Sequence, residues 1–300
     1  MRILIIGCGK LGVATASLLT TAGHDVIAMR RQPQALPDWL NSQAVDVLDP
    51  SSLAVLPSLN ADVIIYQATP AAFSEAAYRD IYATGVRNVV SELQGSSATL
   101  LLVSSTGVYH QADGSWVDET SDTNPDSFSG RMVLEGERNA LSMGNACVVR
   151  LSGIYGSSRL RLIERARSGD WSTSDKHWTN RIHEVDAARA LAHLVVLALH
   201  ARNENKALPP IWLASDSEPA QFADVMSYLA TELGVTEHEV APQDTSQSAK
   251  QGGRRAGSKR CSNQLLLASG FTFKYPDYRI GYGKIIQAVS YTHLTLPTKA

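Results

Sequence analysis

The first half of the chain alternates short apolar runs with longer segments in which apolar positions recur at helical spacing. The apolar runs predict buried strands at residues 2–6, 25–29, 62–66, 100–103 and 147–151. The segments between them predict helices at residues 11–22, 74–93 and 128–143. Because strands that alternate with helices form parallel sheets, we predict an α/β fold with a doubly wound parallel sheet, covered by helices on both faces.

The pattern becomes less regular in the second half of the chain. It predicts helices at residues 185–200 and 221–234, a strand at 211–214 and a flexible loop, rich in Gln, Ser and Gly, at 243–257. We therefore predict a Rossmann core over residues 1–158 and a smaller α+β substrate-binding region over residues 159–288. That region is expected at the carboxyl ends of the strands, where doubly wound sheets bind ligands.

The end of the chain does not fit this scheme. Residues 289–298 read like the translation of a sequencing adapter, so we predict that residues 289–300 are a non-native tail and assign them no function. The alternative is a genuine C-terminal strand, because Tyr, Thr and Leu favour strands.

Composition and charge narrow the functional classes. Lys and Arg number 27 and Asp and Glu number 29, and the resulting net charge of −2 argues against a protein that binds nucleic acid or an anionic membrane. No apolar run reaches the ~18 residues of a membrane-spanning helix. The 3 cysteines are widely spaced and form no disulfide framework, so we expect a cytoplasmic protein. The histidines form no metal-binding motif.

A glycine-rich motif joins the first predicted strand to the first predicted helix. Its sequence is Gly7-Cys8-Gly9-Lys10-Leu11-Gly12. In this pattern the first glycine makes a tight turn, the second lets a pyrophosphate approach the backbone, and the third allows close packing of helix on strand. The free N–H groups and the dipole of the helix favour the phosphates. We therefore predict that this motif binds a dinucleotide; a glycine-rich turn without a ligand is the alternative.

The residues after the second strand indicate which dinucleotide binds. An NAD-binding protein usually has a carboxylate there for the ribose 2′-hydroxyl, whereas this chain has Arg30 and Arg31. Two guanidinium groups suit a 2′-phosphate, so we predict NADP, with NAD and two merely solvated arginines as the alternative. Position alone assigns further residues to the cofactor, namely Asp46, Val47, Ala68 and Thr69.

Several motifs, taken in order, resemble the short-chain dehydrogenase/reductase superfamily. They lie at residues 7–12, 104–109, 150–156, 180–186, 259–263 and 273–276. More narrowly, they are similar to its NAD(P)-dependent epimerase/dehydratase type, in a bacterial branch of nucleoside-diphosphate-sugar epimerase-like proteins. The resemblance covers residues 1–288. It implies that a nicotinamide lies near Ser105, whose hydroxyl bonds a reacting carbonyl or alcohol; a turn serine that caps a strand end is the alternative.

The proton-transferring pair of that family is missing. A Tyr-x-x-x-Lys pair normally lies on one helix face, where the Lys cation lowers the pKa of the tyrosine. The matching positions are Ser129 and Val133, and no tyrosine in the chain has a lysine four residues later. The candidate catalytic residues that remain are Ser105, Tyr109, Ser129 and Arg131.

Two of the candidate residues have a second interpretation. Arg131 either clamps an anionic substrate or pairs with Glu135, one helical turn away. Tyr155 either lies beside the nicotinamide or shapes the loop that follows its strand.

We therefore expect an NAD(P)-dependent oxidoreductase or epimerase-like protein that acts on a carbonyl or alcohol of a sugar or nucleotide-sugar-like substrate. The alternative is a non-catalytic NADP(H)-binding redox sensor or regulatory protein, which the missing pair favours. The resemblance also implies a homodimer formed through the helices at 74–93 and 128–143.

Overall fold

The computed structural model describes residues 1–235 and 257–294. Nearly all of the predicted flexible loop at 243–257 lies outside the described residues, as does the end of the predicted tail, at 295–300.

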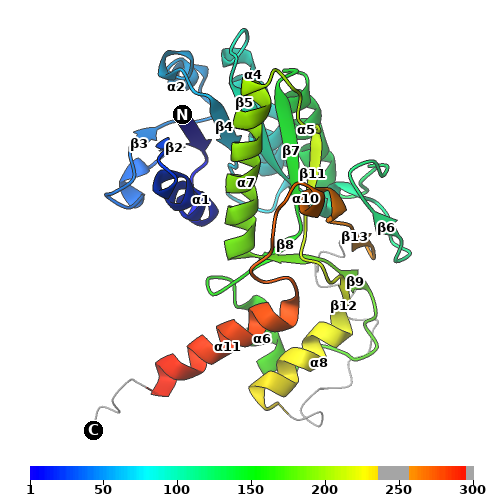
Figure 1. Ribbon diagram of the computed structural model, residues 1–300. Coiled ribbons are helices and arrows are strands. Elements are labelled where there is room, and N and C mark those ends of the chain that lie inside the picture. Colours follow the sequence, from blue (N-terminus) through cyan, green and yellow to red (C-terminus); the bar gives the residue numbers. More distant parts are fainter. Residues whose placement is uncertain (236–256, 295–300) are drawn as a thin grey trace.

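A seven-stranded parallel sheet forms the centre of the molecule (Figure 1). In spatial order its strands are β11 (Ile211–Ala214), β7 (Ala146–Leu151), β5 (Thr99–Ser105), β4 (Val63–Tyr66), β1 (Arg2–Ile6), β2 (Asp25–Arg30) and β3 (Ser42–Ala44). Every neighbouring pair is parallel. The chain passes from β1 to β2 on one side and later returns to β4 on the other, so the connections reverse at the carboxyl ends of β1 and β4. Doubly wound sheets bind ligands at such a reversal.

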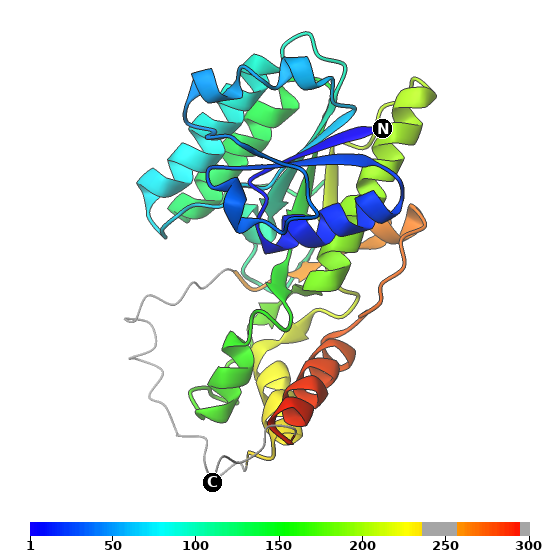
Figure 2. The same cartoon turned by 90° about the vertical axis from the view of Figure 1, so that its left-hand side faces the viewer.

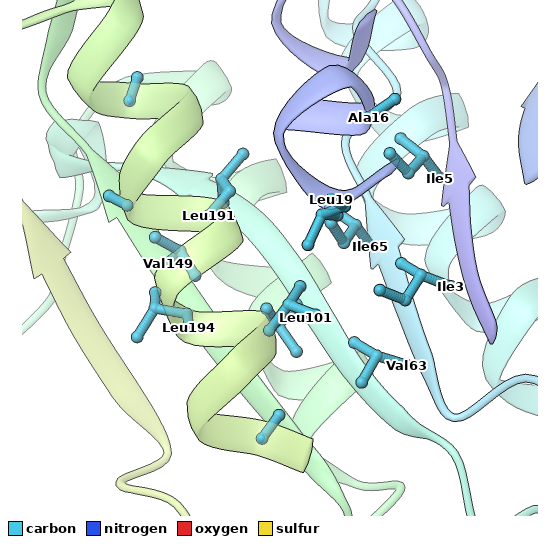
Figure 3. Packing of buried hydrophobic residues seen from close by; sticks show 14 of the residues in the cluster. Ile3, Ile5, Ala16, Leu19, Val63, Ile65, Leu101, Val149, Leu191 and Leu194 are labelled. Atoms are coloured by element: carbon cyan, nitrogen blue, oxygen red, sulfur yellow. The ribbon is translucent and has the colours of Figure 1, made fainter. Parts of the chain in front are cut away.

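Helices cover both faces of the sheet, as the sequence predicted. The helices are α1 (Lys10–Thr21), α2 (Pro50–Leu53), α3 (Glu75–Tyr78), α4 (Val86–Glu92), α5 (Phe128–Leu141), α6 (Arg161–Arg167), α7 (Glu184–Asn203), α8 (Phe222–Leu233), α10 (Gln264–Ala268) and α11 (Tyr278–Leu294). α1 and α7 bury alternate strand residues such as Ile5, Ile65 and Leu101 on one face (Figure 3). α4 and α5 bury the intervening residues, such as Ile64 and Leu100, on the other. Because both faces are buried, the strands are apolar throughout.

The helix predicted at residues 74–93 is interrupted. Between α3 and α4 the chain forms a π-helical segment, η3 (Arg79–Gly85). Its wider turn leaves the carbonyl of Ile81 free to accept a hydrogen bond from Tyr66 Oη, at 2.6 Å. Gly85 allows this close approach, because a Cβ on it would lie 2.6 Å from the same hydroxyl. The periodicity of the sequence carried no sign of this long-range contact.

A smaller second lobe lies beyond the carboxyl ends of the strands (Figure 2). Its helices α6, α8 and α11 enclose an apolar core of their own. Short strands link it to the sheet domain, namely β6 (Trp116–Val117), β8 (Gly153–Tyr155), β9 (Trp178–Thr179), β10 (Arg181–His183), β12 (Ala220–Gln221) and β13 (Arg260–Cys261). Single helical turns complete the fold, namely η1 (Pro33–Ala35), η2 (Pro57–Leu59) and η4 (Thr106–Val108). Residues 289–294 continue α11, so the alternative of a C-terminal strand there is wrong.

Candidate functional site

The glycine motif forms the turn between β1 and α1 at the reversal point of the sheet. Gly7 has φ +79°, and a Cβ on it would lie 2.3 Å from Cα of Ala68. The N–H groups of Gly7 and Cys8 both donate to the carbonyl of Met29, at 2.8 and 3.0 Å. The turn is therefore fixed to the ends of β2 and β4, and only glycine fits its first position.

The other two glycines differ sharply in their surroundings. Around Gly9, the residue before α1, no described atom lies within 4 Å of an ideal Cβ, and no side chain caps the helix. Gly12 is covered instead, because a Cβ there would lie 2.0 Å from Gln67 Nε2 and 2.9 Å from Cys8 Sγ. Gly9 thus leaves the helix N-terminus open to a ligand, while Gly12 allows close packing. This arrangement fits the pyrophosphate of a dinucleotide.

Gln67 belongs to this site, although the sequence pattern did not single it out. It follows β4, is only 7% exposed, and among the described residues neither its amide oxygen nor its amide nitrogen has a hydrogen-bond partner. Buried amides are nearly always bonded, so an unpartnered one beside the glycine turn favours a bound polar group there. A polar residue at the end of an apolar strand was the available signal.

The predicted cofactor residues gather around the same edge of the sheet. Arg30 ends β2, and its Nη1 donates to the carbonyl of Cys8 at 3.5 Å, whereas Arg31 is exposed. Neither arginine forms an ion pair with a carboxylate within residues 1–235 and 257–288. The remaining positions line the ends of neighbouring strands: Asp46 and Val47 follow β3, and Ala68 and Thr69 follow Gln67.

A pocket of about 270 Å³ lies next to the glycine motif, between the two lobes. Lys10 and Leu11 line it from the first turn of α1, Arg159 from the turn after β8, and Glu184 from the first turn of α7. Its walls thus include two cationic side chains and one carboxylate. The first residues of α1 and of α7 line the same pocket.

The side chain of Ser105 caps the end of a strand, and its hydroxyl donates no hydrogen bond within the described part of the chain. Ser105 ends β5, is partly exposed, and its Oγ accepts a hydrogen bond from the N–H of Gly107 at 3.1 Å. This contact is the strand-end cap that was the alternative at the level of sequence, yet it leaves the hydroxyl proton free to donate. Ser129 is partly exposed in the first turn of α5, and its Oγ lies 3.2 Å from Ser127 Oγ.

Val133, at the position that the resemblance assigns to the family lysine, lies in an apolar cluster. Val133 is 4% exposed and packs in one cluster with Tyr109, Leu213 and Cys261. α5 contains no lysine, and the residue four positions after Ser129 is this buried valine.

Tyr109 and Tyr155 are both buried, and the hydroxyl of each forms hydrogen bonds. Tyr109 Oη donates to the carbonyl of Asp118 at 2.7 Å and accepts from Arg150 Nη1 at 3.0 Å. Tyr155 lies in the core of the second lobe, 4.4 Å from Tyr282 between ring centroids. Burial raises the pKa of both phenols far above the usual range. Neither hydroxyl is exposed for proton transfer, and the position of Tyr155 fits the alternative in which it shapes the loop after its strand.

Arg131 does not form the ion pair with Glu135. Its guanidinium donates to the carbonyl of Asp126, at 2.5 Å, and remains exposed. Glu135 pairs instead with Arg87 of α4, at 3.4 Å. The prediction of the helical pair was wrong because a neighbouring helix supplies a second cation, which sequence spacing does not reveal.

A group of buried polar residues follows the ends of β7 and β11. Ser152 Oγ, Arg181 Nη1 and both carboxylate oxygens of Asp216 have no hydrogen-bond partner among the described residues. Burial raises the pKa of Asp216 to about 8, although nearby Arg181 partly opposes the shift. Lys259, only 3% exposed, lies near the thiol of Cys261, and burial lowers its pKa. The sequence pattern did not single out Ser152, Asp216 or Lys259 as site residues.

Neither a metal centre nor a membrane span is found in the described ranges. Residues 1–235 and 257–294 contain no group of three or more His, Cys, Asp or Glu side chains placed to hold a metal ion. Within those ranges no helix is long and apolar enough to cross a membrane.

The reversal point, the open helix N-terminus and the three glycines define a dinucleotide-binding α/β protein. Residues 1–291 match the model of the RmlD substrate binding domain, and the chain belongs to this family. The predicted resemblance to the NAD-dependent epimerase/dehydratases is thereby confirmed.

Solved structures agree with this assignment. A Methylobacillus flagellatus protein described as a putative NAD-dependent epimerase/dehydratase is 34% identical, with a TM-score of 0.80 over 96% of this chain and 98% of its own. UDP-glucose 4-epimerase of Thermus thermophilus, in complex with NAD, is 17% identical, with a TM-score of 0.73 over 96% and 98%. The dTDP-glucose 4,6-dehydratase of Bacillus anthracis, also with NAD, is 15% identical, with a TM-score of 0.74 over 98% of each chain. The last two show the fold alone.

One curated relative is much longer than this chain. The FAD-dependent monooxygenase nanF of Aspergillus nanangensis is 28% identical over 179 residues, which are 55% of this chain and 37% of that protein. The match therefore spans little more than a third of that relative.

Proposed function

We propose that the protein binds NADP(H) and transfers a hydride to or from a carbonyl or alcohol of a sugar or nucleotide-sugar-like substrate. The observation that carries the cofactor choice is Arg30, whose guanidinium lies against the backbone of the glycine turn at Cys8 and has no carboxylate partner among the described residues. There it can hold a 2′-phosphate through charge-assisted bonds. The NAD found in the structural relatives makes NAD the alternative.

The chain's own residues would position the reactants. The nicotinamide supplies or accepts the hydride when the cofactor is bound. Ser105, at the end of β5, would donate its free hydroxyl proton in a hydrogen bond to the substrate oxygen and so stabilise the charge that develops there. Because the two candidate tyrosines, Tyr109 and Tyr155, are buried, Ser129 or a water molecule would exchange the proton.

One observation favours the second candidate, a non-catalytic NADP(H)-binding regulatory protein. Val133 fills the space of the family lysine with an apolar cluster, so the usual activation of an acid–base residue is lost. A protein that transfers no proton does not need a lysine at this position and would tolerate a valine there. The two candidates share the same cofactor site and differ only in turnover.

The first experiment is a fluorescence titration with NADPH and NADH. We expect NADPH to bind at least tenfold more tightly, and Arg30→Ala to remove that preference, since a hydrogen bond to a charged group contributes about 1.5–3 kcal/mol. Arg87→Ala, on the exposed face of α4, serves as the control. Equal affinities of the native protein for both nucleotides would contradict the NADP assignment.

Turnover then separates the two candidates. Consumption of NADPH with any member of a panel of carbonyl sugars and nucleotide sugars supports the enzyme. Tight binding with no turnover across the panel supports the regulatory protein.

We also propose a homodimer formed through α3–α4 and α5. These helices pack together on one face of the sheet, and Phe73, before α3, is 55% exposed. Light scattering after gel filtration tests this proposal: a monomer at micromolar concentration would contradict it.

A further inference from the structure

The pocket between the two lobes receives two helix N-termini. Lys10 is the first residue of α1 and Glu184 the first residue of α7, and both line the pocket. The aligned peptide dipoles place partial positive charge at each of these ends. The pocket is therefore suited to an anionic group, and its lining residue Lys10 directly follows Gly9 in the chain.

The turn after β8 presents Arg159 to this pocket in a fixed position. The N–H of Arg159 donates to the carbonyl of Gly156 at 3.0 Å, which closes a tight turn. Glu184 holds the turn against α7 by accepting hydrogen bonds from Ser157 Oγ at 2.9 Å and from Ser158 Oγ at 2.7 Å. A Cβ on Gly156 would lie 2.1 Å from the carboxyl carbon of Glu184, so only glycine permits this contact.

These bonds also determine how Glu184 acts on an anion. Its carboxylate is directed to the two serine hydroxyls and to the N–H of Ser158, at 3.4 Å. Burial acts to raise its pKa, but these hydrogen bonds together with His183 outweigh burial and lower it. The donors offset part of its charge. Arg159 is exposed and, like Lys10, has no ion-pair partner among the described residues, so both cations remain available to a ligand.

A separate observation points to a ligand at the same end of α1. The buried amide of Gln67 packs against Gly12, in the first helical turn, and has no partner within the described part of the chain. A dinucleotide whose phosphates rest on this turn would bring polar atoms close to that amide.

We propose that Arg159 is a cofactor-positioning residue: its guanidinium, from the turn after β8, binds the pyrophosphate that the glycine motif holds, in the pocket that Lys10 also lines. A pyrophosphate diester carries one negative charge on each phosphate, and the two cations match this pair of charges. The proposal rests on the proposed cofactor and deepens it, because the dinucleotide then joins the sheet domain to the second lobe.

Two ligands separate this contact from the rest of the cofactor site. NADPH carries both the 2′-phosphate and the pyrophosphate, whereas adenosine 2′-monophosphate carries only the former. We expect Arg159→Ala to weaken the binding of NADPH about tenfold, equivalent to about 1.4 kcal/mol, and to leave the affinity for adenosine 2′-monophosphate unchanged. Arg30→Ala is expected to weaken the binding of both ligands. Arg161→Ala, exposed at the start of α6, is the matched control and should change neither.

The outcomes can be told apart. An NADPH affinity for Arg159→Ala within twofold of the native value would overturn the proposal while leaving the cofactor assignment intact. Equal weakening of both ligands would also overturn it, since the substitution would then disturb the whole site. Failure of the native protein to bind NADPH would overturn the proposed function itself, and this inference with it.

Discussion

The amide nitrogen of Gln67 occupies the space that a side chain on Gly12 would need, because a Cβ on residue 12 would lie only 2.0 Å away. Gln67 is itself buried and has little room to move. The last glycine of the motif therefore serves the packing of α1 on β4, while Gly9 serves the ligand. The same three glycines thus separate into structural and binding positions.

This separation predicts different results for two alanine substitutions. Gly9→Ala should leave the Tm of the ligand-free protein unchanged, because no described atom beyond its chain neighbours lies within 4 Å of the new Cβ. It should nevertheless weaken NADPH binding, because the Cβ occupies the space through which the phosphates approach the backbone. Gly7→Ala should destabilise the protein by about 2 kcal/mol or more, because φ is +79° and the backbone of Ala68 blocks the Cβ. Thermal unfolding with and without NADPH measures both effects. A large fall in Tm for Gly9→Ala would contradict the assignment.

The buried carboxyl of Asp216 should make the free energy of unfolding depend on pH. Burial raises its pKa in the folded protein to about 8, against an unfolded value near 3.8, while Asp277 and Glu218 add to the shift and Arg181 opposes it. The folded state therefore binds more protons between these pKa values. Its contribution to stability is complete below about pH 4 and is lost as the pH rises toward 8, by up to about 1.4 kcal/mol per pH unit.

Urea unfolding at pH 5 and pH 8 tests this dependence. Asp216→Asn should flatten the difference in unfolding free energy between the two pH values, because its amide does not titrate. Asp126→Asn, an exposed control, should leave the difference as it is in the native protein. An unchanged pH dependence in Asp216→Asn would show that Asp216 is ionised at neutral pH.

The buried ion pair beneath the candidate site predicts a large loss of stability. Glu137 accepts from Arg150 at 2.7 and 3.0 Å and from Ser104, with the two charged side chains 2% and 5% exposed. Glu137→Ala should cost about 3–5 kcal/mol, because it leaves the Arg150 charge buried without its partner. Glu135→Ala, which breaks only the exposed pair with Arg87, should cost less than about 1 kcal/mol. Chemical denaturation compares the two, and similar losses would contradict this interpretation.

Replacing Ser105 should lower turnover without weakening cofactor binding. If the proposed reaction is found, Ser105→Ala should lower kcat about 100-fold, because the hydrogen bond to the substrate oxygen is lost. The Kd for NADPH should not change. Ser142→Ala, at the end of α5, is the control. A parallel rise in the Kd for NADPH would place Ser105 in cofactor binding instead.

Sequence patterns predicted the parallel sheet and the glycine turn because both depend on local information. Apolar runs between helices indicate parallel strands, and the steric demands of a turn such as that at Gly7 are written in its own residues. The interruption of the helix at Arg79–Gly85 was missed, since it coincides with a contact to Tyr66, which lies on a strand far away in the sequence.

The sequence by itself determined the fold class and the position of the glycine motif, and it contains no tyrosine with a lysine four residues later. Only the tertiary structure decided which polar residues are buried and which line the pocket beside the glycine motif. It buried Tyr109 and Tyr155, and it brought two residues to the start of α1, with Gln67 against Gly12 and Arg159 in the pocket that Lys10 also lines. The physical reason is that burial and hydrogen bonding depend on segments far apart in the chain, which meet only when the sheet and the second lobe pack together.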